Sequence, residues 1–175
     1  FSGGTLKMAT KKPRTILYRR RREGKTDYSK RLKLLLARKP RLTVRLTNRK
    51  IIAQLIEFNP QGDKILVAVD SLALKEQGWN HSFRNLPAAY LTGLLIGKKV
   101  LEKKISEAIL DSGFKSVLKK GVLTSFLKGV IDAGVNIPHG DDKIFPPEDR
   151  LTGKHIQNND KIVEDFNKVK DKIMK

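Results

Sequence analysis

The chain has 175 residues, enough for one compact domain with an arm or two. Its 37 Lys and Arg against 18 Asp and Glu give a formal net charge of +19, which indicates a polyanionic partner: nucleic acid first, an anionic membrane surface second. The absence of cysteine excludes disulfides, thiolate zinc sites and cysteine nucleophiles.

The charge is concentrated near the N-terminus. Residues 1–50 contain 18 Lys and Arg against two acids, whereas residues 51–175 contain 19 against 16. A nearly neutral body that carries a basic segment is typical of nucleic-acid-binding proteins. Charge that served only solubility would be spread more evenly.

Residues 1–25 are predicted to form a basic arm. Met8 is interpreted as the natural start, so residues 1–7 are treated as upstream residues and left out of fold reasoning. Residues 9–25 have almost no apolar content, which predicts an extended segment that becomes ordered only on its partner.

A short helix is expected to follow the arm. It begins at Thr26 or Asp27, whose side chains can cap a helix, and runs to about Lys39, because Pro40 cannot continue it. The pattern is amphipathic, with a basic face for phosphates. The other face is expected to pack on the core and carries Tyr28, Leu32, Leu35 and Leu36.

Three strands joined by short turns are predicted next, forming an antiparallel meander. Residues 41–47 alternate with period two, so Arg41, Thr43 and Arg45 share the face opposite the apolar residues. Residues 48–50 form a tight turn, and strands follow over 51–58 and 64–69.

Two helices and a fourth strand complete the predicted body. Pro87 begins a long helix that runs to about Lys104 and lies against the sheet, because its first half is apolar on nearly every side. A brief strand over 107–111 is expected to be parallel to its neighbour, since it follows a strand and a helix. A second apolar helix spans 122–131 and ends at Gly134.

The predicted fold class is therefore α/β: a mixed, mostly antiparallel sheet packed by two helices. We divide the chain into the basic arm at 1–25, an α/β core at 26–140 and a helical C-terminal extension at 141–175. The extension carries a thin apolar stripe on a charged helix, formed by Ile162, Phe166, Val169 and Ile173.

Two glycines could suggest nucleotide chemistry. The segment Gly93-Leu-Leu-Ile-Gly97-Lys98-Lys99 resembles a phosphate loop, but three residues separate the glycines instead of four. Lys99 also stands where a magnesium-binding Ser or Thr is needed. We interpret the glycines as positions of close helix-on-sheet packing.

Two sets of polar residues could bind a metal ion. The only possible metal cluster in a single segment is His139, Asp141 and Asp142, which ordinary turn chemistry also explains. Three acids at the ends of predicted elements could hold magnesium in a nuclease, although no fixed motif joins them: Asp70, Asp111 and Asp132.

The strongest motif is the basic and aromatic segment from Arg14 to Arg31. Arginine offers a planar fork of donors for phosphate oxygens, and Tyr18 and Tyr28 can stack on unpaired bases. A four-arginine run could also be a nuclear-localisation tag. Because this run continues into a charged helix and an arginine-faced strand, an extended binding surface is favoured.

Several separate blocks, in order, resemble one known family. They are Arg19-Arg-Arg-Arg-Glu-Gly-Lys-Thr-Asp-Tyr28, Arg31-Leu32, Lys39-Pro-Arg-Leu42, Ala88-Ala-Tyr-Leu-Thr-Gly93 and Ile131-Asp-Ala-Gly-Val-Asn-Ile-Pro-His139. Over roughly residues 10–160 the chain is similar to the archaeal branch of the universal L-eighteen family of large-subunit ribosomal proteins, related to eukaryotic L-five. The chain departs from the family in the seven residues before Met8 and in the charged tail after about Asn158.

The resemblance implies a structural protein without catalysis. It implies binding to 5S ribosomal RNA and its attachment to large-subunit ribosomal RNA at the central protuberance, beside neighbouring ribosomal proteins, on the cytoplasmic ribosome. No cofactor, metal, membrane or small-molecule substrate is expected. The rival hypotheses from the residues alone are the magnesium nuclease and a membrane-surface or DNA-binding protein.

The predicted RNA-binding residues combine the basic segment with the first strand and its turn. They are Lys11, Lys12, Arg14, Tyr18, Arg19, Arg20, Arg21, Arg22, Lys25, Tyr28, Arg31, Lys33, Arg38, Arg41, Arg45, Asn48, Arg49 and Lys50.

Overall fold

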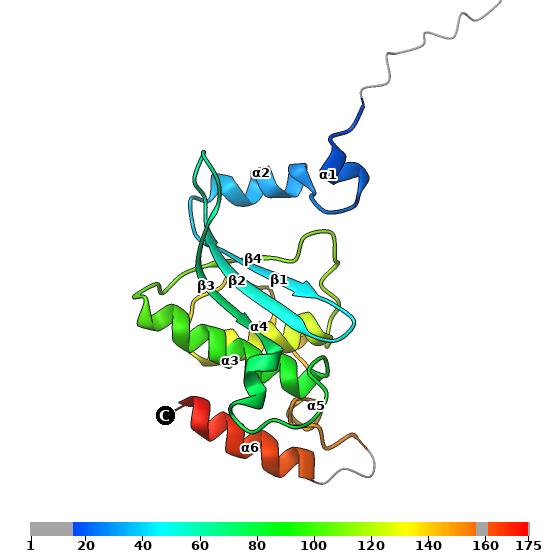
Figure 1. Ribbon diagram of the computed structural model, residues 1–175. Coiled ribbons are helices and arrows are strands. Elements are labelled where there is room, and N and C mark those ends of the chain that lie inside the picture. The colour runs from blue at the N-terminus through cyan, green and yellow to red at the C-terminus, as the bar shows by residue number, and fades with distance from the viewer. Residues whose placement is uncertain (1–15, 157–160, 175) are drawn as a thin grey trace, which may run out of the picture.

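A four-stranded mixed sheet forms the centre of the computed structural model, which describes residues 16–156 and 161–174 (Figure 1). The strands are β1 (Arg41–Leu46), β2 (Ile51–Glu57), β3 (Lys64–Asp70) and β4 (Ile109–Asp111), in the spatial order β3-β2-β1-β4. The first three pair antiparallel, and β4 pairs parallel to β1. The predicted fold class, meander and parallel fourth strand are confirmed.

Helices α3 (Leu86–Glu102) and α4 (Val122–Asp132) cover one face of the sheet (Figure 1). Asn85 caps α3, with its side-chain oxygen accepting from the Ala88 amide at 3.0 Å, and Pro87 lies in the first turn as predicted. The main core forms between the sheet and these helices, from residues such as Leu42, Ile51, Leu55, Ile96 and Phe126.

The glycines of α3 pack against α4, so the prediction of helix-on-sheet packing is wrong. A Cβ on Gly93 would overlap the backbone oxygen of Phe126, and one on Gly97 would overlap the side chain of Ala133. Gly129 of α4 packs equally closely against α3, since a Cβ there would overlap the backbone oxygen of Tyr90. The spacing of the glycines identifies a close approach, but it does not say which neighbour approaches.

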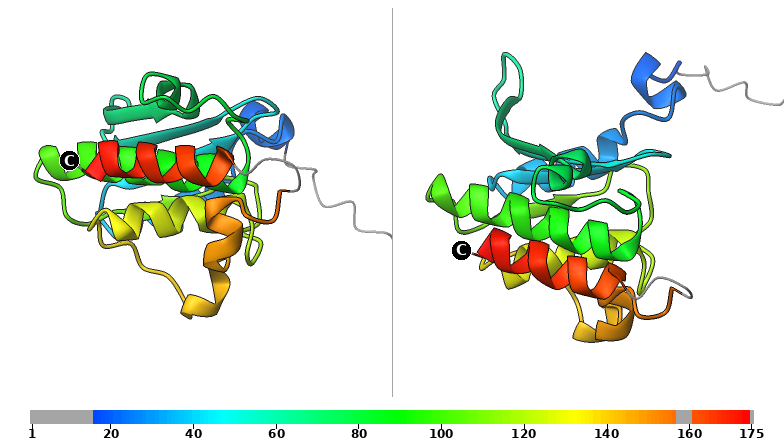
Figure 2. Two further views of the ribbon diagram at one scale, coloured as in Figure 1. Left: turned by 90° about the horizontal axis from the view of Figure 1, so that it is seen from below. Right: turned by 60° about the horizontal axis from the view of Figure 1, so that its bottom comes forward.

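A third layer lies on the far side of α3. Helix α6 (Lys161–Met174) runs along α3, as Figure 2 shows, and α5 (Glu148–Thr152) contacts both. The predicted stripe is confirmed, since its four apolar residues are buried in a second core with Trp79, just beyond the 3-10 helix η1 (Ser71–Lys75). None of the described helices is long and apolar enough to cross a membrane.

The chain before β1 lies on the opposite side of the sheet from α3 and α4 (Figure 1). It forms one helical turn, α1 (Arg19–Arg22), and a two-and-a-half-turn helix, α2 (Tyr28–Leu36), which ends three residues before the predicted Lys39. The extended conformation predicted for 9–25 is therefore wrong for Arg19–Arg22. Residues 9–15 lie outside the described part of the chain.

Candidate nucleic-acid interface

Four consecutive arginines form the ordered turn α1. The turn closes because the backbone oxygen of Arg20 accepts from the amides of Lys25 and Thr26, at 2.9 and 3.2 Å, around Gly24, whose φ is 63°. The Arg20 Nε also donates to Thr26 Oγ1 at 2.9 Å. Local hydrogen bonds, which the charge pattern does not reveal, thus fold this part of the arm.

The four arginines differ in what their charges meet. Glu23 lies 3.5 Å from the Arg19 Nε and 2.8 Å from the Lys25 Nζ, so it partly neutralises both. Arg21 and Arg22 are exposed and contact no carboxylate among the described residues. They are the two arginines of α1 most available to an outside anion.

Asp27, one of the two predicted capping residues, is the N-cap of α2. The Asp27 Oδ1 accepts from the amides of Ser29 and Lys30, both at 3.1 Å. Tyr28 packs against the exposed Tyr18, with ring centroids 5.2 Å apart, and this contact joins α1 to α2.

The predicted core face of α2 is wrong. No residue of α2 is buried, and Leu32 and Leu36 are 62% and 74% exposed. Periodicity shows that one side of a helix is apolar, but the helix packs on the core only if its neighbours bring it there. In this structure α2 stands above the sheet and is held by polar groups.

An ion-pair network attaches α2 to the sheet. The Arg31 Nη2 donates to both carboxylate oxygens of Asp63, at 2.9 and 2.8 Å. The Arg41 guanidinium of β1 bridges Asp63 at 2.7 Å and Asp111 at 3.1 Å. Beside this network, the Lys30 Nζ donates to Ser112 Oγ at 2.9 Å and to a backbone oxygen.

The two arginines also control the ionisation of Asp63. Burial by itself raises the pKa of this carboxyl, but the hydrogen bonds and positive charges of Arg31 and Arg41 outweigh burial and hold the pKa below its ordinary value. Asp63 therefore stays ionised near neutral pH, which keeps the network intact.

The expectation that Arg41 lies on an exposed face is wrong. Its side chain is only 3% exposed and its guanidinium is committed to two carboxylates, while Thr43, on the same face of β1, is 6% exposed. Only Arg45, further along the strand, is exposed. Arg41 and Thr43 are both buried at the start of the strand, where Asp63 and Asp111 bind the Arg41 guanidinium.

The turn between β1 and β2 presents polar side chains to solvent. Arg45, Asn48 and Arg49 are exposed, and neither arginine contacts a carboxylate among the described residues. Lys50 differs, because its Nζ lies 2.7 Å from Asp70 Oδ2. Lys33 and Arg38 of the α2 region are also exposed, whereas Lys11, Lys12 and Arg14 lie outside the described residues.

The segment 112–121, between β4 and α4, was not predicted as part of the site. It lies on the same side of the molecule as α1 (Figure 1), and Lys115 donates to the backbone oxygen of Leu46 at 2.9 Å. Phe114 is 49% exposed, and Lys119 and Lys120 are also exposed. Its sequence signal is weak: three lysines and an aromatic residue between Gly113 and Gly121, in a half of the chain that is nearly neutral overall.

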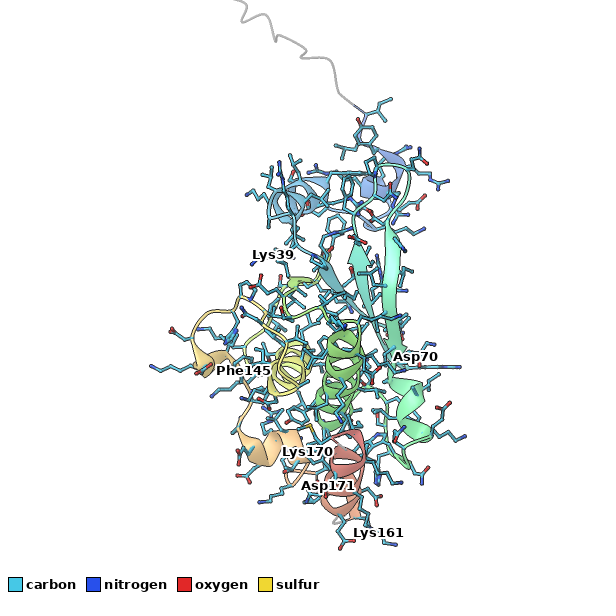
Figure 3. The ribbon with its side chains drawn as sticks, turned by 90° about the vertical axis from the view of Figure 1, so that its left-hand side faces the viewer. Lys39, Asp70, Phe145, Lys161, Lys170 and Asp171 are labelled. Carbon is cyan, nitrogen blue, oxygen red and sulfur yellow. The ribbon has the colours of Figure 1, made fainter. Side chains whose placement is uncertain are left out.

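The acids proposed for a magnesium nuclease do not meet. Asp70 and Asp111 lie on the opposite edge strands, β3 and β4, and each pairs with a basic residue. Figure 3 shows Asp70 at the end of β3, beside η1 and far below α2. Asp132 accepts from the Tyr90 hydroxyl at 2.8 Å. In residues 16–156 and 161–174, no cluster of three metal-binding side chains forms, at these acids or at His139.

Comparison with known proteins identifies the class. A family model described as "Ribosomal large subunit proteins 60S L5, and 50S L18" matches residues 14–107. The chain is 50% identical over 141 residues to the "Large ribosomal subunit protein uL18" of Korarchaeum cryptofilum (strain OPF8), covering 81% of this chain and 72% of the relative. It is 47% identical over 143 residues to the protein of that name from Methanococcus maripaludis, covering 82% and 74%.

These matches and the basic face of the α/β fold define a structural protein of the large ribosomal subunit, not an enzyme. The chain belongs to the family of 60S L5 and 50S L18, in its archaeal form, as the family resemblance predicted. Ribosomal RNA and ribosomal proteins are therefore its partners, and the cytoplasmic ribosome is its location. The nuclease, membrane-surface and DNA-binding hypotheses are set aside.

Proposed function

We propose that this protein binds 5S ribosomal RNA and helps attach it to large-subunit ribosomal RNA at the central protuberance. One observation carries the RNA surface: α1, α2 and the first strand with its turn present exposed cations that lack a carboxylate partner among the described residues. They include Arg21, Arg22, Lys33, Arg38, Arg45 and Arg49.

The arrangement suits the backbone of structured RNA. The deep groove of an RNA helix is closed to side chains, so phosphates, 2′-hydroxyls and exposed loop bases are what a protein can contact. Isolated guanidinium groups on an ordered turn can each approach a phosphate. The folded body at 26–140 would position the surface, and the arm at 1–25 would extend it along the RNA.

Two parts of the surface are expected to do different work. The exposed arginines of α1 belong to the arm and supply general attraction. The backbone positions of Arg45 and Arg49 are fixed by the sheet and its turn. We therefore expect these two arginines to distinguish RNAs whose phosphates lie in different arrangements. Reversing both charges, as Arg45→Glu with Arg49→Glu, should therefore reduce preference for 5S RNA over unrelated RNA.

Filter binding with purified 5S RNA tests the proposal directly. Unrelated structured RNA of equal length and duplex DNA serve as competitors, and the double variant Lys98→Glu with Lys99→Glu, on α3, is the charge-matched control. The proposal predicts at least a tenfold preference for 5S RNA at physiological salt, lost only in the β1 turn variant. Equal binding to all competitors would refute it.

Attachment at the central protuberance needs a separate measurement. Large subunits assembled without this protein should lack 5S RNA on gels of the purified particles, and adding the protein should restore it. Full 5S RNA content without the protein would refute this part of the proposal.

A further inference from the structure

A cavity of about 490 Å³ lies between the arm and the face of the sheet that α3 and α4 leave open. Its lining comprises residues of the arm and α2 within 20–31, residues of β1 within 41–46, residues 111–115 at and beyond the end of β4, and Ile56 and Asp63. The volume falls within the range of about 300–1,000 Å³ that is usual for sites of small organic ligands.

The charges in the lining favour an anion. Seven Lys and Arg face three Asp, and all three carboxylates are occupied within the protein: Asp27 caps α2, and the other two bind arginines. Lys30 and Lys115 instead direct their ammonium groups to neutral oxygens. Their charges therefore remain available to a ligand, together with that of Arg45.

Two buried polar groups in the lining have no hydrogen-bond partner among the described residues. They are the Nε of Arg41 and the Oγ1 of Thr43. A buried donor without a partner is costly, by about 1–3 kcal/mol. Both residues line the cavity, so these unpaired groups place unsatisfied polar chemistry at its wall.

An aromatic ring stands beside the cations. Phe114 lines the cavity and remains 49% exposed, next to Lys115. An exposed ring beside positive charge is the combination that binds a single-stranded nucleotide, because the base stacks on the ring and the cation meets the phosphate.

We propose that this cavity receives one unpaired nucleotide of the bound RNA, with its base against Phe114 and its phosphate between Arg45 and Lys115. The inference rests on the proposed function, because the RNA surface surrounds the cavity. It adds a defined single-nucleotide site to contacts that otherwise read only the backbone.

Nuclear magnetic resonance with free nucleotides tests the cavity without the large RNA. In ¹⁵N-labelled protein, adenosine and uridine 5′-monophosphates should shift the amide signals of residues 43–45 and 112–115 and saturate, and at least one should bind tenfold more tightly than inorganic phosphate. Equal binding of inorganic phosphate would leave only an anion site and overturn the proposal. Shifts confined to α1, or none, would also overturn it.

Binding of intact 5S RNA gives an independent readout. Phe114→Ala should weaken binding roughly 5- to 150-fold, the range expected for loss of one base stack, and Phe114→Trp should restore it. Leu118→Ala is the matched control, because Leu118 is 71% exposed in the same segment but does not line the cavity.

These measurements separate the cavity from the proposed function. If wild-type protein prefers 5S RNA and Phe114→Ala loses no more affinity than Leu118→Ala, the nucleotide site is wrong and the proposed function stands. If wild-type protein shows no preference for 5S RNA, the proposed function fails, and the mononucleotide titration alone decides the cavity.

Discussion

Replacing all four arginines of α1 by glutamine should reduce the salt dependence of 5S RNA binding by a predictable amount. Glutamine keeps a good helix propensity, so the Arg19–Arg22 turn should persist while its charge falls by four. All four residues are exposed and none takes part in the core, so the unfolding free energy should hardly change.

The magnitude follows from the number of phosphates that the turn can reach. Each lost contact takes about 0.7–0.9 from the slope of log K against log salt. If only Arg21 and Arg22 contact phosphates, because Arg19 meets Glu23 and Arg20 meets Thr26, the slope should fall by about 1.4–1.8. If all four contact phosphates, it should fall by about 2.8–3.6.

Filter binding between 50 and 200 mM potassium chloride measures this slope. The control removes the same charge elsewhere, by changing Lys98, Lys99, Lys103 and Lys104 at the end of α3 to glutamine, and should alter the slope by less than about 1. An unchanged slope in the arginine variant, or an equal change in the control, would show that the RNA lies on another face.

Three further predictions concern the body and its attachment to α2. Gly129→Ala should lower the unfolding free energy by about 1–3 kcal/mol in urea titrations, because its Cβ would overlap the backbone of α3, whereas Gly140→Ala, in open space, should change it by less than about 0.5 kcal/mol. Deleting residues 1–25 should leave cooperative thermal unfolding nearly unchanged, since residues 16–25 bury no side chain; a large fall in Tm would contradict this. Asp63→Asn should destabilise the protein at neutral pH, and its difference from wild type should shrink as the pH falls below about 5, through the unfolded pKa of about 3.9 and then the lowered folded pKa. The sign follows from the lowered pKa of Asp63, whose stabilisation is complete above the unfolded value and lost on protonation; a difference that grows in acid would refute it.

Periodic burial made most of the fold predictable from the sequence. The apolar residues of β1 and the stripe of α6 are side chains that leave water, and they recur in the structure as a buried strand face and a buried helix face. The turn residues before β2 and β3 mark where the strands end. Helix boundaries were less exact, because Arg38 adopts a left-handed φ of 52° and ends α2 before Pro40 is reached.

The failures arose where a neighbour distant in sequence decides the outcome. The leucines of α2 form an apolar stripe, yet nothing apolar among the described residues comes to cover Leu32. The glycines of α3 mark a close approach, but only the fold shows that α4 is the element approaching. A pattern within one segment describes that segment and does not name its partner.

In the candidate site, likewise, the sequence pattern does not show which basic residues are exposed. Arg41 and Arg45 lie on the same face of one strand, and the sequence gives them the same prediction. Asp63 and Asp111, 22 and 70 residues from Arg41, turn the first into a buried support and leave the second exposed. Counting basic residues therefore overestimates the cations that RNA can reach.

Arg31 and Arg41 bind carboxylates within the protein, whereas other arginines are exposed. This difference determines which electrostatic interactions added salt will weaken. The contacts that hold α2, between Asp63 and the two arginines Arg31 and Arg41, span 2.7–2.9 Å, and the Arg41 side chain is only 3% exposed. Screening reaches over about 8–10 Å near physiological ionic strength, and it weakens partly buried pairs much less than exposed ones. Between 50 and 200 mM salt α2 should stay attached, because its anchor is short and shielded. A change in slope over that range therefore counts phosphates at exposed arginines such as Arg21 and Arg22 of α1, and does not report release of α2 from the sheet.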